Sequence, residues 1–158
     1  MKIGVVSDTH SIEIPKQVFT AFRTVDFIIH AGDLADAGTL KALQKIKEVK
    51  AVWGNADGSD VRKALPATLI IPVGKFKIGV FHGEGPGAKV LERVQKEFKG
   101  EKLDAVVFGH SHQALNEKIK GVLYFNPGNP NDTVSAPYCS YGILDVTDKG
   151  ITGTIIKL

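Results

Sequence analysis

Apolar residues along the chain follow two alternating patterns, short dense runs and longer segments with helical spacing. The runs 3–6, 27–29 and 49–53 are rich in valine and isoleucine and too short for helices, which predicts buried strands. The segments 18–22 and 34–46 carry apolar side chains three and four positions apart, which predicts amphipathic helices. The first third of the chain is therefore expected to alternate strands with helices, as parallel sheets do.

The rest of the chain is richer in strands. The segments 68–73 and 76–81 are expected to form a hairpin around Gly74 and Lys75, and a helix is expected over 90–98. Further strands, most of them antiparallel, are expected at 106–108, 115–119, 122–125, 141–146 and 151–158.

These elements together predict an α/β fold. The glycine- and proline-rich stretch 126–137 is expected to be a long loop inside one domain over 1–158, because no repeat or linker-like composition interrupts the chain. Loops of that length are uncommon unless they have a function. Trp53 and Cys139 are expected to be core residues in strands.

Composition limits the class of protein. The chain has 43% hydrophobic residues, 23% charged residues and a net charge of +3, as ordinary globular domains do. No block of like charges suggests an extended nucleic-acid footprint, and no apolar stretch approaches the ~20 residues of a membrane span. The single Cys139 suits a reducing compartment, and the apolar run beside Met1 leaves no room for a signal peptide. We therefore expect a cytoplasmic protein with no membrane partner.

Metal-competent side chains follow five of the expected strands at their carboxyl ends. Such ends share one edge of a parallel sheet, and that edge is where ligands bind. Side chains two residues apart in an extended segment also point to the same side. The seven side chains are Asp8, His10, Asp33, Asn55, His82, His110 and His112.

This set has too many ligands for a single ion. Carboxylates, a carboxamide and four imidazoles suit two divalent ions about 3.5–4 Å apart, as in two-metal phosphatases and nucleases. Oxygen and imidazole ligands without thiolate favour Mn, Fe, Zn, Ni or Co over Ca, and Mn is our first candidate. Any one member could be structural, since an aspartate after a strand often caps a helix. The prediction therefore rests on the whole set.

Five short motifs resemble, in order, those of calcineurin-like metallophosphoesterases, above all the small bacterial and archaeal phosphodiesterases. Each motif is weak alone, but five in sequence are highly specific. They are Asp8-x-His10, Gly32-Asp33, Gly54-Asn55, His82-Gly83 and Gly109-His110-Ser111-His112. The resemblance implies a two-sheet β-sandwich flanked by helices, with the metal site at the carboxyl ends of the strands.

The resemblance also implies how the ligands divide. The first ion would be held by Asp8, His10, Asp33 and His112. The second would be held by Asn55, His82 and His110 together with Asp33, which would bridge the two. A hydroxide between the ions would attack phosphorus in line. The implied activity is hydrolysis of phosphoester bonds, most of all phosphodiesters, in a small-molecule substrate.

Some positions depart from the family pattern. Ala56 stands where many members have a histidine that assists the leaving group. Asp57 follows it and, with Asn55, is a candidate catalytic residue; a loop cap or a partner of the ligands is an equally open interpretation. Glu84 replaces a second histidine and is expected to add negative charge near the substrate. Asn129 is expected to have a structural role near the site.

Two other functions stay open. A protein-binding scaffold of the same fold, like the retromer scaffold subunit of eukaryotes, would have an altered metal site, whereas each ligand position here carries a competent side chain. A nuclease would use the same chemistry, but the modest charge and the lack of a basic stripe with interleaved aromatics disfavour it. The oligomeric state is also open, with a homo-oligomer as one alternative.

Overall fold

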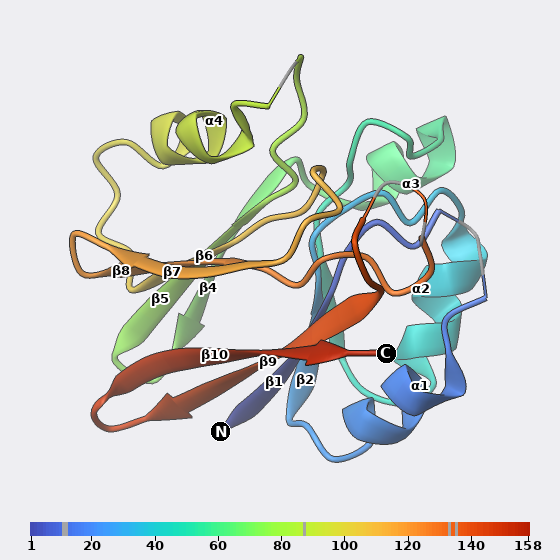
Figure 1. Ribbon diagram of the computed structural model, residues 1–158, viewed down its shortest axis with the longest axis horizontal. Helices are drawn as coiled ribbons and strands as arrows, with labels where there is room; N and C mark the ends of the chain where they lie inside the picture. Colours follow the sequence, from blue (N-terminus) through green and yellow to red (C-terminus); the bar gives the residue numbers. More distant parts are fainter. Residues whose placement is uncertain (11–12, 87, 133, 135) are drawn as a thin grey trace.

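The computed structural model describes residues 1–10, 13–86, 88–132, 134 and 136–158. They form two five-stranded mixed sheets that face each other, with helices on the outer sides (Figure 1). The first sheet has the order β10-β9-β1-β2-β3 and the second the order β4-β5-β6-β8-β7. The expected two-sheet α/β sandwich is therefore confirmed.

The first sheet contains strands from both the start and the end of the chain. Its strands, in spatial order, are β10 (Gly150–Lys157), β9 (Ser140–Thr147), β1 (Lys2–Val6), β2 (Phe27–His30) and β3 (Val49–Ala51). β1, β2 and β3 run parallel, and β9 pairs antiparallel with both β1 and β10. β1 is buried on both faces after its first residue, which explains why its sequence is a continuous apolar run without alternation.

The second sheet contains the expected hairpin and a second parallel set. Its strands, in spatial order, are β4 (Thr68–Val73), β5 (Phe76–Phe81), β6 (Ala105–Val107), β8 (Val122–Asn126) and β7 (Leu115–Ile119). β5, β6 and β8 are parallel, while β4 and β7 close the two edges as antiparallel partners of β5 and β8.

The helices cover the outer faces of the sandwich. They are α1 (Lys16–Phe22), α2 (Ala37–Gln44), α3 (Ser59–Ala64) and α4 (Val90–Glu97). α1 and α2 pack on the first sheet through Phe22 and Leu43, and α4 packs on the second through Val94. The main core lies between the sheets and includes Ile29 and Phe125, both fully buried. None of the helices in the described part is long and apolar enough to cross a membrane.

Three local expectations need correction. α2 begins at Ala37 rather than at residue 34, because the Asp36 carboxylate accepts the backbone N–H groups of Gly38 and Thr39 and caps the helix there. α3 was not expected, since its six residues bury only Val61 and show no apolar period. Trp53 and Cys139 lie outside the strands and are only half-buried.

Candidate metal centre

The carboxyl ends of the parallel strands of both sheets meet on one side of the sandwich. Asp8 follows β1 and Asp33 follows β2 in the first sheet, whereas His82 follows β5 and His112 follows β6 in the second. Across the two sheets, His82 Nε2 lies 3.2 Å from Asp33 Oδ2, and His112 Nε2 lies 3.5 Å from Asp8 Oδ1. The expected gathering of side chains therefore occurs between two facing sheet edges, rather than along one.

Two groups of side chains bring their ligand atoms within 4.8 Å of one another: Asp8 with His10 and His112, and Asp8 with Asp33 and His82. Asp8 thus belongs to both groups. Asp33 Oδ2 also lies 3.8 Å from His10 Nε2. Both carboxylates therefore stand between the two sets of imidazoles, as shared ligands would.

The ring orientations of two histidines direct one nitrogen of each ring toward the cluster. His82 Nδ1 lies 2.8 Å from the Ala31 carbonyl oxygen, and His112 Nδ1 lies 2.8 Å from Asp132 Oδ2. Donation from Nδ1–H to these acceptors turns Nε2 toward the cluster, as in metal-bound histidines. His112 Nε2 shares a hydrogen bond of 3.1 Å with His10 Nε2.

A buried imidazole nitrogen of the cluster is left without a hydrogen bond. His82 Nε2 lies within ion-pair distance of Asp33 Oδ2 (3.2 Å) and Asp8 Oδ1 (3.9 Å), but no described residue forms a hydrogen bond with it. Since an unsatisfied polar atom in a fully buried side chain is costly, a cation at this point would resolve the arrangement. The donor set of oxygen and imidazole therefore fits a divalent metal.

His110 and Asn55 stand at the border of the cluster. The His110 ring lies 5.2 Å from that of His82, centroid to centroid, and its Nε2 lies 3.1 Å from the Gly85 carbonyl oxygen. Its backbone N–H donates to the Asp8 carboxylate. Asn55 is exposed, and the contact found for it in the described part of the chain is a backbone one: its carbonyl oxygen accepts from Arg62 Nη2. The ligand roles of both residues stay predictions.

Asp57 supports the loop that carries Asp33. Its carboxylate accepts the backbone N–H groups of Asp33, Ala35 and Gly54 at 3.1, 2.6 and 2.7 Å. This is the loop-capping role, one of the two interpretations left open for Asp57, and the catalytic role stays a prediction. Ala56 also contributes, since its backbone N–H donates to Asp33 Oδ1 at 2.7 Å.

The backbone at the ligands is unusual. Seven non-glycine residues in the described part have a positive φ, and five of them are predicted ligands: Asp8 (58°), His10 (48°), Asp33 (56°), His110 (68°) and His112 (56°). This left-handed region costs about 1–2 kcal/mol for a residue with a Cβ atom. Strain of this kind clusters at functional sites, and here it falls on the residues whose side chains converge.

Burial and charge shift the pKa values of the cluster. Burial raises the pKa of Asp8 above its usual value, although the charges of His82 and His112 oppose the rise. Burial acts in the same direction on Asp33, but its contact with His82 and the charge of His82 outweigh it, so the pKa of Asp33 is lowered. Burial alone would lower the pKa of His82, yet the Asp33 and Asp8 carboxylates raise it to about 9.

The long loop expected at 126–137 is tied to the cluster. Asn129 is fully buried, donates from Nδ2 to the Asp8 carbonyl oxygen at 2.7 Å, and accepts the N–H groups of Asn131 and Asp132. This matches the structural role expected for Asn129. The same loop brings Asp132 onto His112. Asp132 was not singled out from the sequence, because nothing in its neighbourhood there links it to a histidine 20 residues away.

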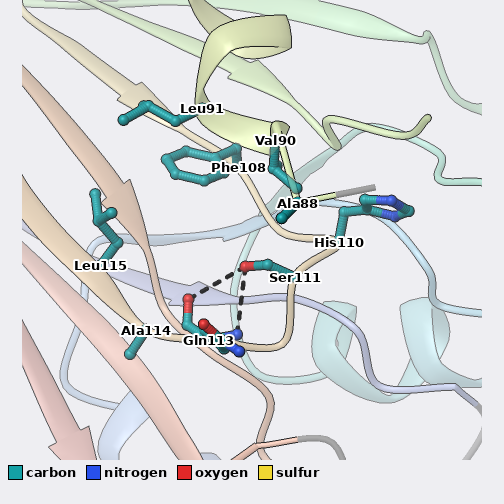
Figure 2. A pocket seen from close by; sticks show the side chains of 9 residues that line it. All are labelled: Ala88, Val90, Leu91, Phe108, His110, Ser111, Gln113, Ala114 and Leu115. Carbon is teal, nitrogen blue, oxygen red and sulfur yellow. Dashed lines mark hydrogen bonds between the residues drawn. The ribbon is translucent and has the colours of Figure 1, made fainter. Parts of the chain in front are cut away.

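A pocket of about 360 Å³ opens beside the cluster, with His110 in its wall (Figure 2). Glu84 lines a different pocket, together with Arg93, Lys96 and Glu97 of α4. The expectation that Glu84 adds negative charge near the substrate stays a prediction.

Comparison with known proteins gives a consistent result. Residues 1–149 match the calcineurin-like phosphoesterase superfamily domain. A probable metallophosphoesterase of Methanocaldococcus jannaschii is 36% identical over 155 residues, covering 94% of this chain and 78% of the relative. A phosphodiesterase of the same organism is 28% identical over 172 residues, covering 94% and 95%.

The fold also matches solved structures. Vps29 from Chaetomium thermophilum superposes with a TM-score of 0.81 at 18% identity, covering 100% of this chain and 95% of that one. At this identity the match shows the fold alone. The family model and the curated relatives, together with the ligand groups between the sheets, confirm the resemblance inferred from the motifs. This chain belongs to the calcineurin-like phosphoesterase superfamily, a family of metal-dependent phosphoesterases.

Proposed function

We propose that this chain is a phosphodiesterase that hydrolyses a small-molecule diester at a dinuclear metal centre, with Mn²⁺ as the first candidate metal. The observation that carries the proposal is the convergence of two ligand groups, each drawn from both sheets, with Asp8 common to both. A phosphodiesterase among the curated relatives supports the substrate class.

The ligands divide between two positions in this proposal. The first position takes Asp8, His10 and His112; the second takes His82 with Asn55 and His110; and Asp33 serves both. Divalent ions held there would lower the pKa of a water molecule, which makes it a nucleophile, and would neutralise charge on the phosphoryl oxygens.

The surrounding residues fix the ligands before a substrate arrives. Asn129 and the His110 backbone N–H hold Asp8 from two sides. Asp57 and Ala56 hold the Asp33 loop and carboxylate. Ligands restrained in this way lose little freedom when they bind an ion or a charged substrate, which favours catalysis.

The second candidate is a protein-binding scaffold, which the likeness of fold to Vps29 favours. Against it stands the convergence of metal-competent side chains, with His82 buried between the carboxylates of Asp8 and Asp33. A scaffold without a metal would have no use for this set of ligands. We place the activity in the cytoplasm, in keeping with the single cysteine.

The experiment is a paired assay on metal-stripped protein. Hydrolysis of bis(p-nitrophenyl) phosphate and of p-nitrophenyl phosphate is followed with EDTA and after Mn²⁺ is restored. We expect activity that returns with metal and a higher kcat/KM for the diester. Bound metal at two ions per chain without hydrolysis of either ester would contradict the proposed activity. Absence of bound metal would favour the scaffold.

A further inference from the structure

The pocket beside the metal-ligand cluster has a mixed wall to which more apolar than polar residues contribute. Its volume of about 360 Å³ lies in the range of small-molecule sites, ~300–1,000 Å³. Six of its nine lining residues are apolar: Ala88, Val90, Leu91, Phe108, Ala114 and Leu115. The polar remainder includes His110, and Figure 2 shows its ring on the opposite side of the pocket from Leu91 and Leu115.

His110 connects this pocket with the ligand cluster. Its ring stands edge-on to the ring of His82, and its backbone N–H donates to the Asp8 carboxylate at 3.1 Å. A phosphoryl group centred on the cluster would therefore place one of its ester groups within reach of the pocket. A simple phosphate monoester of a small alcohol would leave the pocket unused.

The wall of the pocket is part of a packed layer and not a loose surface. Val90 and Phe108 are buried in the cluster between α4 and the second sheet, and Leu91 and Leu115 pack against that cluster. A rigid apolar wall gains free energy when it covers a flat apolar group, because both surfaces leave water.

We infer that this pocket binds the organic ester group that stays on phosphorus when the other is released, and that it selects for an aromatic ring in that group. The inference rests on the proposed function and adds the class of substrate to it. Aromatic rings provide a large apolar area with little conformational freedom to lose. Diesters with an alkyl chain or a very small group at this position are expected to bind more weakly, although they would be hydrolysed by the same reaction.

The test compares two diesters that share a leaving group. Phenyl p-nitrophenyl phosphate and methyl p-nitrophenyl phosphate both release p-nitrophenol and carry one negative charge, so they differ in the second ester group. For Mn²⁺-loaded wild-type protein we expect kcat/KM to be about tenfold higher for the phenyl ester, mostly through KM, as the burial of one ring predicts.

Two variants impair the pocket in different ways. Ala88→Trp fills it from an exposed position, and Leu115→Gln makes its wall polar. Both are expected to reduce the preference for the phenyl ester to about twofold or less, while the metal content of the protein stays unchanged. Ala64→Trp, at an exposed position on α3 outside the pocket, is the matched control and should keep the preference.

A binding measurement separates this inference from the proposed function. Saturation-transfer NMR of phenol with metal-free protein should show ring contacts in the wild type and in Ala64→Trp, but not in Ala88→Trp. Equal kcat/KM for the two diesters in an active wild-type enzyme would overturn the pocket inference and leave the phosphodiesterase intact. Loss of all hydrolysis in metal-loaded protein would overturn both.

Discussion

The Nδ1 atom of His112 lies 2.8 Å from Oδ2 of Asp132, although the two residues belong to different loops and are 20 positions apart. The Asp132 backbone N–H is itself held by Asn129, which also donates to the Asp8 carbonyl oxygen. The long loop after β8 therefore orients one imidazole and supports one aspartate of the same ligand group.

Asp132→Asn is expected to weaken metal binding by about 10- to 100-fold, because the carboxylate that orients His112 and raises its basicity is lost. Metal titration followed by isothermal calorimetry measures the effect. The control Asp148→Asn changes an exposed turn residue and should bind metal as the wild type does. Unchanged affinity in Asp132→Asn would show that the contact with His112 has no influence on the metal.

Asp33→Asn is expected to lower the metal content at both positions and to abolish activity. Asp33 Oδ2 lies 3.2 Å from His82 Nε2 and 3.8 Å from His10 Nε2, so the charge of one carboxylate faces both imidazole sets. Metal per chain is measured by elemental analysis after dialysis. The exposed Glu101→Gln serves as the charge-matched control. Two ions retained at full occupancy in Asp33→Asn would show that Asp33 is not shared.

The stability of the metal-free protein should depend on pH through His82. The contacts with Asp33 and Asp8 raise the pKa of His82 to about 9 against the effect of burial, above the ordinary 6.5. Protonated His82 therefore stabilises the fold fully below pH 6.5, and this contribution is lost as the pH rises from 6.5 to about 9. In urea unfolding with EDTA, the free energy of unfolding of the wild type should exceed that of His82→Gln by a smaller amount as the pH rises across that window. A difference that does not depend on pH would contradict the raised pKa of His82.

The left-handed backbone at His110 predicts that a glycine variant is more stable than an alanine variant, the reverse of the usual order. His110→Gly should be more stable than His110→Ala by about 1 kcal/mol, because glycine adopts the φ of 68° without a Cβ clash. Both variants lack the imidazole, so the difference reports the backbone alone. Gln113, an exposed neighbour whose φ is not positive, provides the control pair, where alanine should equal or exceed glycine. The same order at both positions would refute backbone strain at His110.

Gly109 is expected to be essential for the position of Asp8. A Cβ atom there would lie 2.7 Å from Asp8 Oδ2 and would also overlap Ser7 Oγ. Gly109→Ala should therefore displace the carboxylate and lower metal affinity at least about tenfold, with a smaller loss of thermal stability. At Gly58 the added atom would meet only the end of the Asp60 side chain within 3 Å, so Gly58→Ala is the control. Full metal binding by Gly109→Ala would contradict the expected displacement.

The sequence predicted the strands and the ligand-bearing turns well, because both depend on local patterns. Continuous apolar runs mark strands that are covered on both faces, as β1 and β2 are. The motifs around Asp8, Asp33 and His82 carry their own residue types and spacing. The parallel arrangement of β1 and β2 accounts for the approach of Asp8 to Asp33, whereas His82 reaches them from the second sheet, which the strand pattern alone does not predict.

Other features depend on contacts that no local pattern contains. The pairing of Asp132 with His112 arises from the path of a loop, and the left-handed backbone at Asp8 and His110 occurs without the glycine that usually announces it. α3 is a short polar helix whose single buried residue gives no period. The sequence allows Asp57 to be a catalytic residue or a loop cap. The capping contact becomes visible only in the structure, where the Asp57 carboxylate accepts three backbone N–H groups.

The position of the ligand cluster between two sheets has a consequence for the lifetime of the protein in a cell. Each ligand group combines side chains from both sheets, so an ion bound there ties the two halves of the sandwich together. Metal at 100 times its dissociation constant would add about 2.7 kcal/mol to the free energy of unfolding. A cell short of the metal would therefore lose the protein through faster degradation as well as through lost activity, since abundance follows the unfolded fraction.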